Sequence, residues 1–202
     1  HARILASELR SSGKSIKYLW MRGRGRLLFS LPLLILCRLL KITKVHKLKS
    51  GVKVSEYPFY AYKPLRLIWP WFQLIDSVLY TFILIYLIPA FRSYDILIID
   101  RSVIDTLVDV LADVHFPYMK QTLQRLFLAL LPRNSLVIVL DVNEEIAINR
   151  KKDILNKGYL HIRRRIYLKL AKNYGWYILT TNKNFDSSHD LILEMVTDWL
   201  FQ

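Results

Sequence analysis

The sequence is poor in cysteine and in acidic residues. Its single cysteine, Cys37, excludes a disulfide framework and any metal site built from several cysteines, and it fits a reducing, intracellular setting. The 202 residues carry 30 Lys and Arg against 16 Asp and Glu. The net charge of +14 favours an anionic partner: nucleotide phosphates, nucleic acid or an acidic membrane surface. No secretory signal, internal repeat or long linker is visible, so we expect one domain over residues 1–202.

An uninterrupted transmembrane segment is also lacking. The most apolar stretch, Trp69 to Phe91, contains two prolines and Asp76. A carboxylate near mid-span is costly in lipid, and the remainder from Ser77 to Phe91 is short for a span. We therefore expect a buried helix of a cytoplasmic protein, with membrane association as a less favoured alternative.

A phosphate-cradling loop is missing as well. Gly13-Lys14-Ser15 ends like one, but the glycine that should lie five residues before Gly13 is Glu8. Such a loop joins a strand to a helix, whereas here a helical pattern precedes and strand-like alternation follows. We interpret this tripeptide as a turn.

Short apolar runs separated by helical patterns are the main positive signal. Residues 95–100 and 135–141 each form a buried-strand pattern that ends in a carboxylate, and residues 16–20 and 176–179 give weaker strand patterns. Strands that alternate with helices predict a parallel sheet covered on both faces, with ligands at the carboxyl ends of the strands.

Three segments carry a resemblance to a known family. They are Ile98-Ile99-Asp100-Arg101-Ser102, Leu140-Asp141-Val142-Asn143-Glu144-Glu145-Ile146-Ala147 and Arg163-Arg164-Arg165-Ile166-Tyr167-Leu168-Lys169-Leu170-Ala171. In order and spacing they resemble the thymidylate kinase family, over nearly the whole chain. The resemblance implies an α/β fold, a three-layer P-loop NTPase-like parallel sheet flanked by helices. It also implies that the first strand and the phosphate loop are missing before His1, and that this chain is inactive alone.

The resemblance implies catalytic roles for the residues at the end of the first apolar run. Asp100 would help to hold Mg²⁺ or the acceptor, and Arg101 would clamp the acceptor phosphate with its planar guanidinium. The alternative is a strand-end ion pair between the two residues. For Asp141 we favour a structural role, with Asn143 capping the next helix.

A basic segment resembles the family lid. The lid covers roughly residues 150–160, and its ATP-contacting cations would be Arg150, Lys151, Arg163 and Arg164. Arg150 matches the catalytic family position best. A solvated basic face is the alternative, and the sequence leaves open which of Arg163 to Arg165 points inward, because neighbours on a helix diverge by about 100°.

The acceptor pocket departs from the family pattern. Asp76-Ser77 stands where the family has an Arg beside an acidic or amide residue, and Ser102 replaces an aromatic residue. We expect Arg22 to supply a phosphate contact, and Phe72 and Asp76 to line the substrate site.

We therefore expect ATP- and Mg²⁺-dependent phosphoryl transfer to a nucleoside monophosphate in nucleotide biosynthesis, with dTMP converted to dTDP. Another small phosphate acceptor is the alternative substrate. A homodimer is possible, and a nucleic-acid partner is not expected. A non-catalytic basic protein that binds a membrane or nucleic acid is the other alternative, but it leaves the three ordered segments unexplained.

Overall fold

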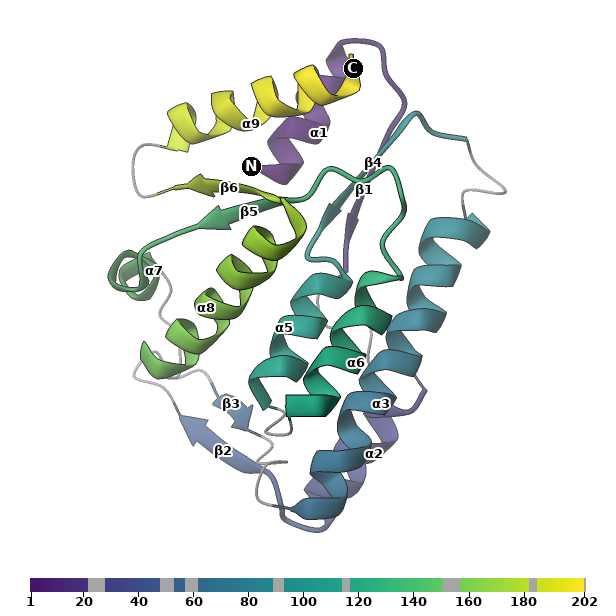
Figure 1. Cartoon of the computed structure of the whole chain (residues 1–202), viewed down its shortest axis with the longest axis vertical. Coiled ribbons are helices and arrows are strands. Elements are labelled where there is room, and N and C mark those ends of the chain that lie inside the picture. Colours follow the sequence, from purple (N-terminus) through teal and green to yellow (C-terminus); the bar gives the residue numbers. More distant parts are fainter. Residues whose placement is uncertain are drawn as a thin grey trace.

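The structure, a computed structural model, describes residues 1–21, 28–47, 53–56, 62–88, 93–113, 117–150, 157–181 and 185–201. Helices alternate with short strands along the chain (Figure 1). In chain order the elements are α1 (Ala2–Ser11), β1 (Ile16–Trp20), α2 (Ser30–Leu39), β2 (Lys44–Lys47), β3 (Lys53–Glu56), α3 (Lys63–Thr81), η2 (Phe82–Leu87), β4 (Ile96–Asp100), α5 (Val103–Asp113), α6 (Pro117–Leu128), β5 (Ile138–Asp141), α7 (Glu144–Arg150), α8 (Lys157–Tyr174), β6 (Tyr177–Thr180) and α9 (Phe185–Leu200).

The four predicted strands are confirmed, and they form two parallel pairs. β1 pairs with β4, from Ile16 opposite Ile96 to Trp20 opposite Asp100. β5 pairs with β6 in the same parallel sense. Within the described residues, β4 and β5 are not hydrogen-bonded to each other, so the continuous sheet that the sequence predicts is divided in two. The antiparallel hairpin of β2 and β3, in the lysine-rich connector, was not predicted.

Both parallel pairs nevertheless lie in one middle layer. On one face, Ile98 of β4 and Ile138 of β5 pack in the same hydrophobic cluster as α1 and α9. The neighbouring residues Ile99 and Val137 pack in the other cluster, with α5, α6 and α8. Successive strand side chains point to opposite faces, so this alternation places the two pairs between the same helical layers (Figure 1). The protein is therefore a mixed α/β structure in three layers.

The middle layer is incompletely covered. All five residues of β4 are only partly buried, and Leu140 of β5 is 42% exposed. Parallel strands that have helices on both faces are normally buried throughout. Each strand of the two parallel pairs, β4 and β5 included, also has one unpaired edge among the described residues.

Helix α3 confirms the helix predicted in the apolar stretch, and the expectation of burial holds for one face only. Leu74 and Tyr80 lie in the main core with α5 and α6, while Ile75 and Val78 are exposed by 40% and 42%. Together with η2, this is the one helix in the described part of the chain that is long and apolar enough to cross a membrane, a criterion that core helices also meet.

Candidate functional site

The carboxyl end of β4 holds the first predicted site residue. The Tyr18 hydroxyl of β1 donates a 2.9 Å hydrogen bond to Oδ2 of Asp100, and the Met21 amide donates to the Asp100 carbonyl. Asp100 is partly buried. Its carboxylate is therefore held at the strand end by the neighbouring strand.

Arg101 follows in a strained conformation. Its φ of 65° lies in the left-handed region, which is uncommon for a residue with a side chain and tends to occur at functional sites. Its Nη1 donates a 2.9 Å hydrogen bond to Oδ1 of Asp105. The alternative interpretation required Arg101 to pair with Asp100, but the ion-pair partner in the structure is Asp105. Burial lowers the pKa of the Arg101 guanidinium, but the Asp105 carboxylate outweighs it and the net shift is upward.

Helix α8 reaches the same carboxylate from the other side. The Tyr167 hydroxyl donates a 2.6 Å hydrogen bond to Oδ1 of Asp105. Burial, together with the Asp105 charge, raises the pKa of Tyr167 well above its usual range. Sequence reasoning missed both Asp105 and Tyr167. The available signal was the spacing of Arg101 and Asp105, four residues apart at the start of a helix.

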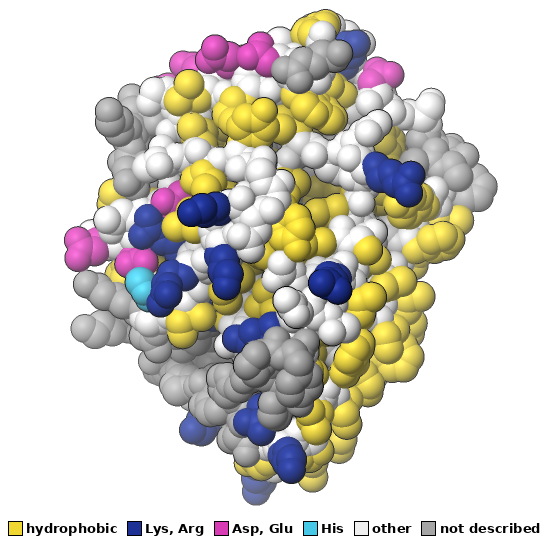
Figure 2. All heavy atoms as spheres, in the orientation of Figure 1, with side chains coloured by type: hydrophobic (Ala, Val, Ile, Leu, Met, Phe, Trp, Pro, Cys, Tyr) yellow, Lys and Arg dark blue, Asp and Glu magenta, His cyan; other side chains and the backbone are white. Residues whose placement is uncertain are grey.

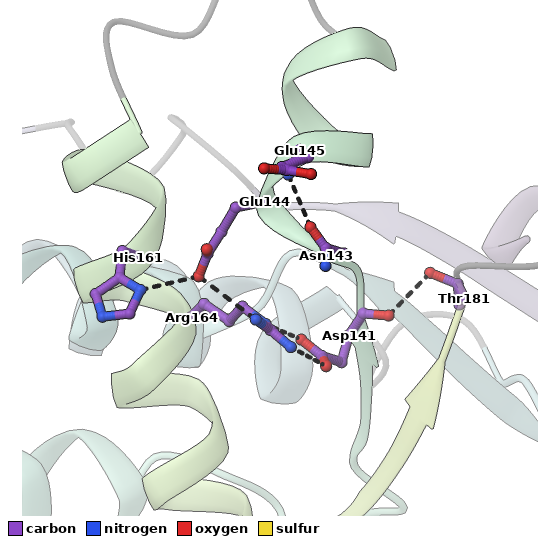
Figure 3. Close-up of polar contacts among 7 residues, drawn as sticks. All are labelled: Asp141, Asn143, Glu144, Glu145, His161, Arg164 and Thr181. Carbon is purple, nitrogen blue, oxygen red and sulfur yellow. Dashed lines mark hydrogen bonds and ion pairs between the residues drawn. The ribbon is translucent and has the colours of Figure 1, made fainter.

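A second cluster lies at the carboxyl end of β5 (Figure 3). Arg164 of α8 binds Asp141 with two parallel hydrogen bonds, Nε to Oδ1 at 2.7 Å and Nη2 to Oδ2 at 2.9 Å. Its Nη1 lies 3.4 Å from Oε1 of Glu144, and Nδ1 of His161 lies 3.0 Å from the same oxygen. The His161 contact, followed by that of Arg164, lowers the pKa of the Glu144 carboxyl.

The residues around this cluster have the expected structural roles. Oδ1 of Asn143 accepts a 2.9 Å hydrogen bond from the Glu145 amide, which confirms the predicted helix cap (Figure 3). The Thr181 amide and hydroxyl both donate to the Asp141 carbonyl. The Asp141 carboxylate, by contrast, binds Arg164, a role that its position in the sequence did not indicate.

The three consecutive arginines diverge around α8. Arg163 points to α5, where Nε lies 2.6 Å from Oδ1 of Asp109 and Nη2 lies 3.7 Å from Oδ1 of Asp113. Arg164 points to the end of β5, and Arg165 is exposed. Both predicted lid cations in this group therefore bind carboxylates in this structure, and their contact with ATP stays a prediction.

Asp76 and Phe72 lie in a different place, against α2. Asp76 is 0% exposed: its Oδ1 accepts the amides of Leu28 and Phe29 at 3.1 Å, and its Oδ2 accepts the Ser30 amide at 2.9 Å. The Phe72 ring packs 5.5 Å from that of Phe29, measured between centroids. This geometry makes Asp76 a cap for α2 and gives no support to the predicted substrate contacts.

The remaining predicted site residues lie in or near the expected phosphate-contacting and lid segments. Arg22, Lys151 and the side chain of Arg150 lie outside the described residues, as does most of the predicted lid. The Gly13-Lys14-Ser15 turn is described, and it connects α1 to β1. Gly13 has a φ of 86°, and the Ser15 amide binds Asp95, so the prediction of a turn is confirmed.

Neither protein-family models nor curated proteins gave a match to this chain. The resemblance to thymidylate kinases therefore depends on the three sequence segments.

Proposed function

We propose that this chain is the greater part of an ATP- and Mg²⁺-dependent nucleoside monophosphate kinase of the thymidylate kinase type, with dTMP as acceptor. One observation carries the proposal. A strained, partly exposed arginine follows a carboxylate at the carboxyl end of an apolar parallel strand. In open α/β sheets this edge is where nucleotides bind.

The residues at this edge suit phosphoryl transfer, in which catalysis is mostly charge neutralisation and positioning. Arg101 is the candidate clamp for the acceptor phosphate, because its guanidinium offers several N–H donors and only Nη1 is engaged by Asp105 in the described contacts. Asp100 would hold Mg²⁺, which neutralises phosphate charge and is commonly bound in proteins through one or two carboxylates plus phosphates and water.

The divided sheet supports the same proposal. β4 and β5 are apolar, lie in one layer and each have an unpaired edge in the described part of the chain. A further parallel strand between them would join both pairs into one sheet and cover their exposed side chains. It would also end at the edge where Asp100 and Arg101 lie, the position from which a phosphate loop would serve these residues.

Helix α8 contacts carboxylates near the carboxyl ends of both β4 and β5. Tyr167 contacts the carboxylate that holds Arg101, and Arg164 contacts the carboxylate at the end of β5. Closure of the segment before α8 over ATP would bring its cations to the transferring phosphate. The capping role of Asp76 leaves the acceptor pocket without one predicted residue, which keeps another small phosphate acceptor as the second candidate substrate.

This proposal is tested first by the reading frame upstream of His1. We expect it to encode a strand followed by Gly-x-x-x-x-Gly-Lys-Ser/Thr, and we call the protein that includes this segment the extended protein. In calorimetric titration the extended protein is expected to bind Mg²⁺-ATP, and the 202-residue chain is expected to show no measurable binding. An upstream segment without this loop, or an extended protein that does not bind ATP, would contradict the proposed function.

A further inference from the structure

Helix α3 and its continuation η2 expose apolar side chains and bury polar ones, the reverse of an ordinary surface helix. From Leu67 onward the polar side chains of α3 point inward: Gln73 donates to the Ser30 hydroxyl and Asp76 caps α2. The outward side chains are apolar and each is at least 36% exposed; they are Leu67, Ile68, Trp71, Ile75, Val78, Phe82, Ile83, Tyr86 and Leu87. Asp76 is the only charged residue between Leu67 and Leu87, and it is buried.

Helix α2 extends this apolar surface. It packs on α3 through Leu33, Leu34 and Cys37, which form one hydrophobic cluster with Trp69 of α3. Its other side exposes Leu28, Phe29, Leu31, Ile35, Leu36, Leu39 and Leu40 by 41–73%. We call these exposed residues of α2, α3 and η2 the apolar face. Exposed apolar surface this extensive is uncommon on a soluble monomer and marks a contact surface.

Charge is distributed unevenly around the apolar face. Arg38, Lys41 and Lys44 follow the C-terminal part of α2, and Lys63 and Arg66 begin α3. Because α2 runs antiparallel to α3, with Asp76 capping its start and Trp69 packed on Cys37, these cations gather at one end. Residues 28–88 contain 8 Lys and Arg but only 2 Asp and Glu.

Helix α9, at the opposite end of the molecule, is acidic. Helix α9 carries Asp186, Asp190, Glu194 and Asp198 and no Lys or Arg. Figure 2 shows acidic side chains at the top, over α9, hydrophobic side chains along the lower right, over α3, and Lys and Arg at the lower tip. An anionic surface would therefore attract the cations beside the apolar face and repel α9, and this difference orients the molecule.

We propose that the apolar face docks on a membrane surface rich in acidic phospholipids, with α2 and α3 lying in the plane of the interface. This inference is independent of the proposed kinase activity. Its physical basis is the burial of apolar side chains at the acyl boundary combined with attraction of the adjacent cations to lipid phosphates.

A spanning orientation does not fit the packing. Leu74 and Tyr80 on the inner side of α3 lie in the main core with Leu107 of α5 and Phe127 of α6. A helix that crossed the bilayer would have to leave this core. A second copy is disfavoured because it would bury the apolar side chains but bring few carboxylates to the adjacent cations, since residues 28–88 contain only 2 Asp and Glu.

The experiment is flotation of the 202-residue chain with lipid vesicles. Vesicles of phosphatidylcholine and phosphatidylglycerol in equal parts are expected to bind the chain about tenfold or more tightly than vesicles of phosphatidylcholine alone. Binding should weaken with added salt, and alkaline carbonate should release the chain, because the contact is peripheral.

Three variants distinguish a loss of lipid binding from a loss of the folded structure. The double variant Ile75→Asp, Val78→Asp should lose binding, and Lys41→Glu, Lys44→Glu should lose the preference for the acidic vesicles. Leu191→Asp, at a residue of α9 that is 46% exposed, adds a charge to a similarly exposed apolar site and should bind as the unchanged chain does. Melting temperatures show which variants are folded.

Several results would overturn the proposal. They are equal binding to both vesicle types, unchanged binding by both double variants, and retention on the vesicles in alkaline carbonate. A further contradicting result is a chain that binds no vesicles and that light scattering shows to be a dimer. A dimer whose mass falls to that of a monomer on Ile75→Asp, Val78→Asp would assign the apolar face to a second copy instead.

Discussion

Replacement of Asp76 by Ala is expected to lower the free energy of unfolding by about 2–4 kcal/mol. The substitution leaves three backbone amides at the start of α2 without an acceptor. The Ser30 amide is buried and loses its partner outright, whereas the Leu28 and Phe29 amides belong to exposed residues and regain part of their hydrogen bonding from water. Chemical denaturation measures the change.

Two further variants make this test specific. Asp76→Asn keeps one oxygen acceptor, but its side-chain NH₂ group then faces a backbone N–H that has lost its acceptor. The free energy of unfolding should therefore fall by less than in Asp76→Ala. Asp190→Ala removes an exposed carboxylate of α9 and should change stability by less than about 0.5 kcal/mol. Equal effects of Asp76→Ala and Asp190→Ala would show that Asp76 does not hold α2.

The same carboxylate predicts an acid dependence. Burial raises the pKa of Asp76, but hydrogen bonds from Ser30, Phe29 and Leu28 outweigh it and hold the pKa below its ordinary value. The stabilisation is therefore fully present above the unfolded-state pKa of about 3.9 and is lost as the pH falls through the lower folded-state pKa. Asp76→Asn should lack this part of the acid transition, and an unchanged transition would contradict the assignment.

Replacement of Arg101 by Gly is expected to separate function from stability. Glycine removes the left-handed strain, which costs roughly 1–2 kcal/mol for a residue with a side chain, and this offsets the lost ion pair to Asp105 and the added freedom of the unfolded chain. The free energy of unfolding should change by less than about 1 kcal/mol. Acceptor affinity of the extended protein should fall by about 1–3 kcal/mol, because the phosphate clamp is gone.

The conservative variant Arg101→Lys provides the control. Lysine keeps the charge and loses the planar fork, so dTMP binding in calorimetric titration should weaken while Mg²⁺-ATP binding changes little. If Arg101 were only the structural partner of Asp105, Arg101→Gly would lower the melting temperature and leave acceptor affinity intact. That outcome would remove Arg101 from the site.

The strands were predictable because their signal is local. β4 and β5 are apolar runs that end in Asp100 and Asp141, and their neighbours in the sequence form helices. The β2–β3 hairpin was missed since its strands, Lys44–Lys47 and Lys53–Glu56, carry one valine each within lysine-rich surroundings. That is too little apolar alternation to predict a strand.

The partners of the charged residues could not be predicted from local sequence patterns. Arg101 and Asp100 are adjacent, yet Arg101 pairs with Asp105 and Asp100 with Tyr18, a residue 82 positions away. Asp76 looked like a pocket residue because the sequence does not show that the start of α2 packs against it. The division of the sheet depends on which strands pair, and pairing between distant segments is not encoded in either strand alone.

Phosphoryl transfer itself is the most direct test of the proposed function. The extended protein, supplied with Mg²⁺-ATP and dTMP, should form dTDP and ADP in equal amounts, and the 202-residue chain under the same conditions should form neither. Arg101→Gly in the extended protein should retain ATP binding and lose most of this transfer. An extended protein that folds and binds ATP, yet transfers phosphate to neither dTMP nor any other monophosphate acceptor, would contradict the account.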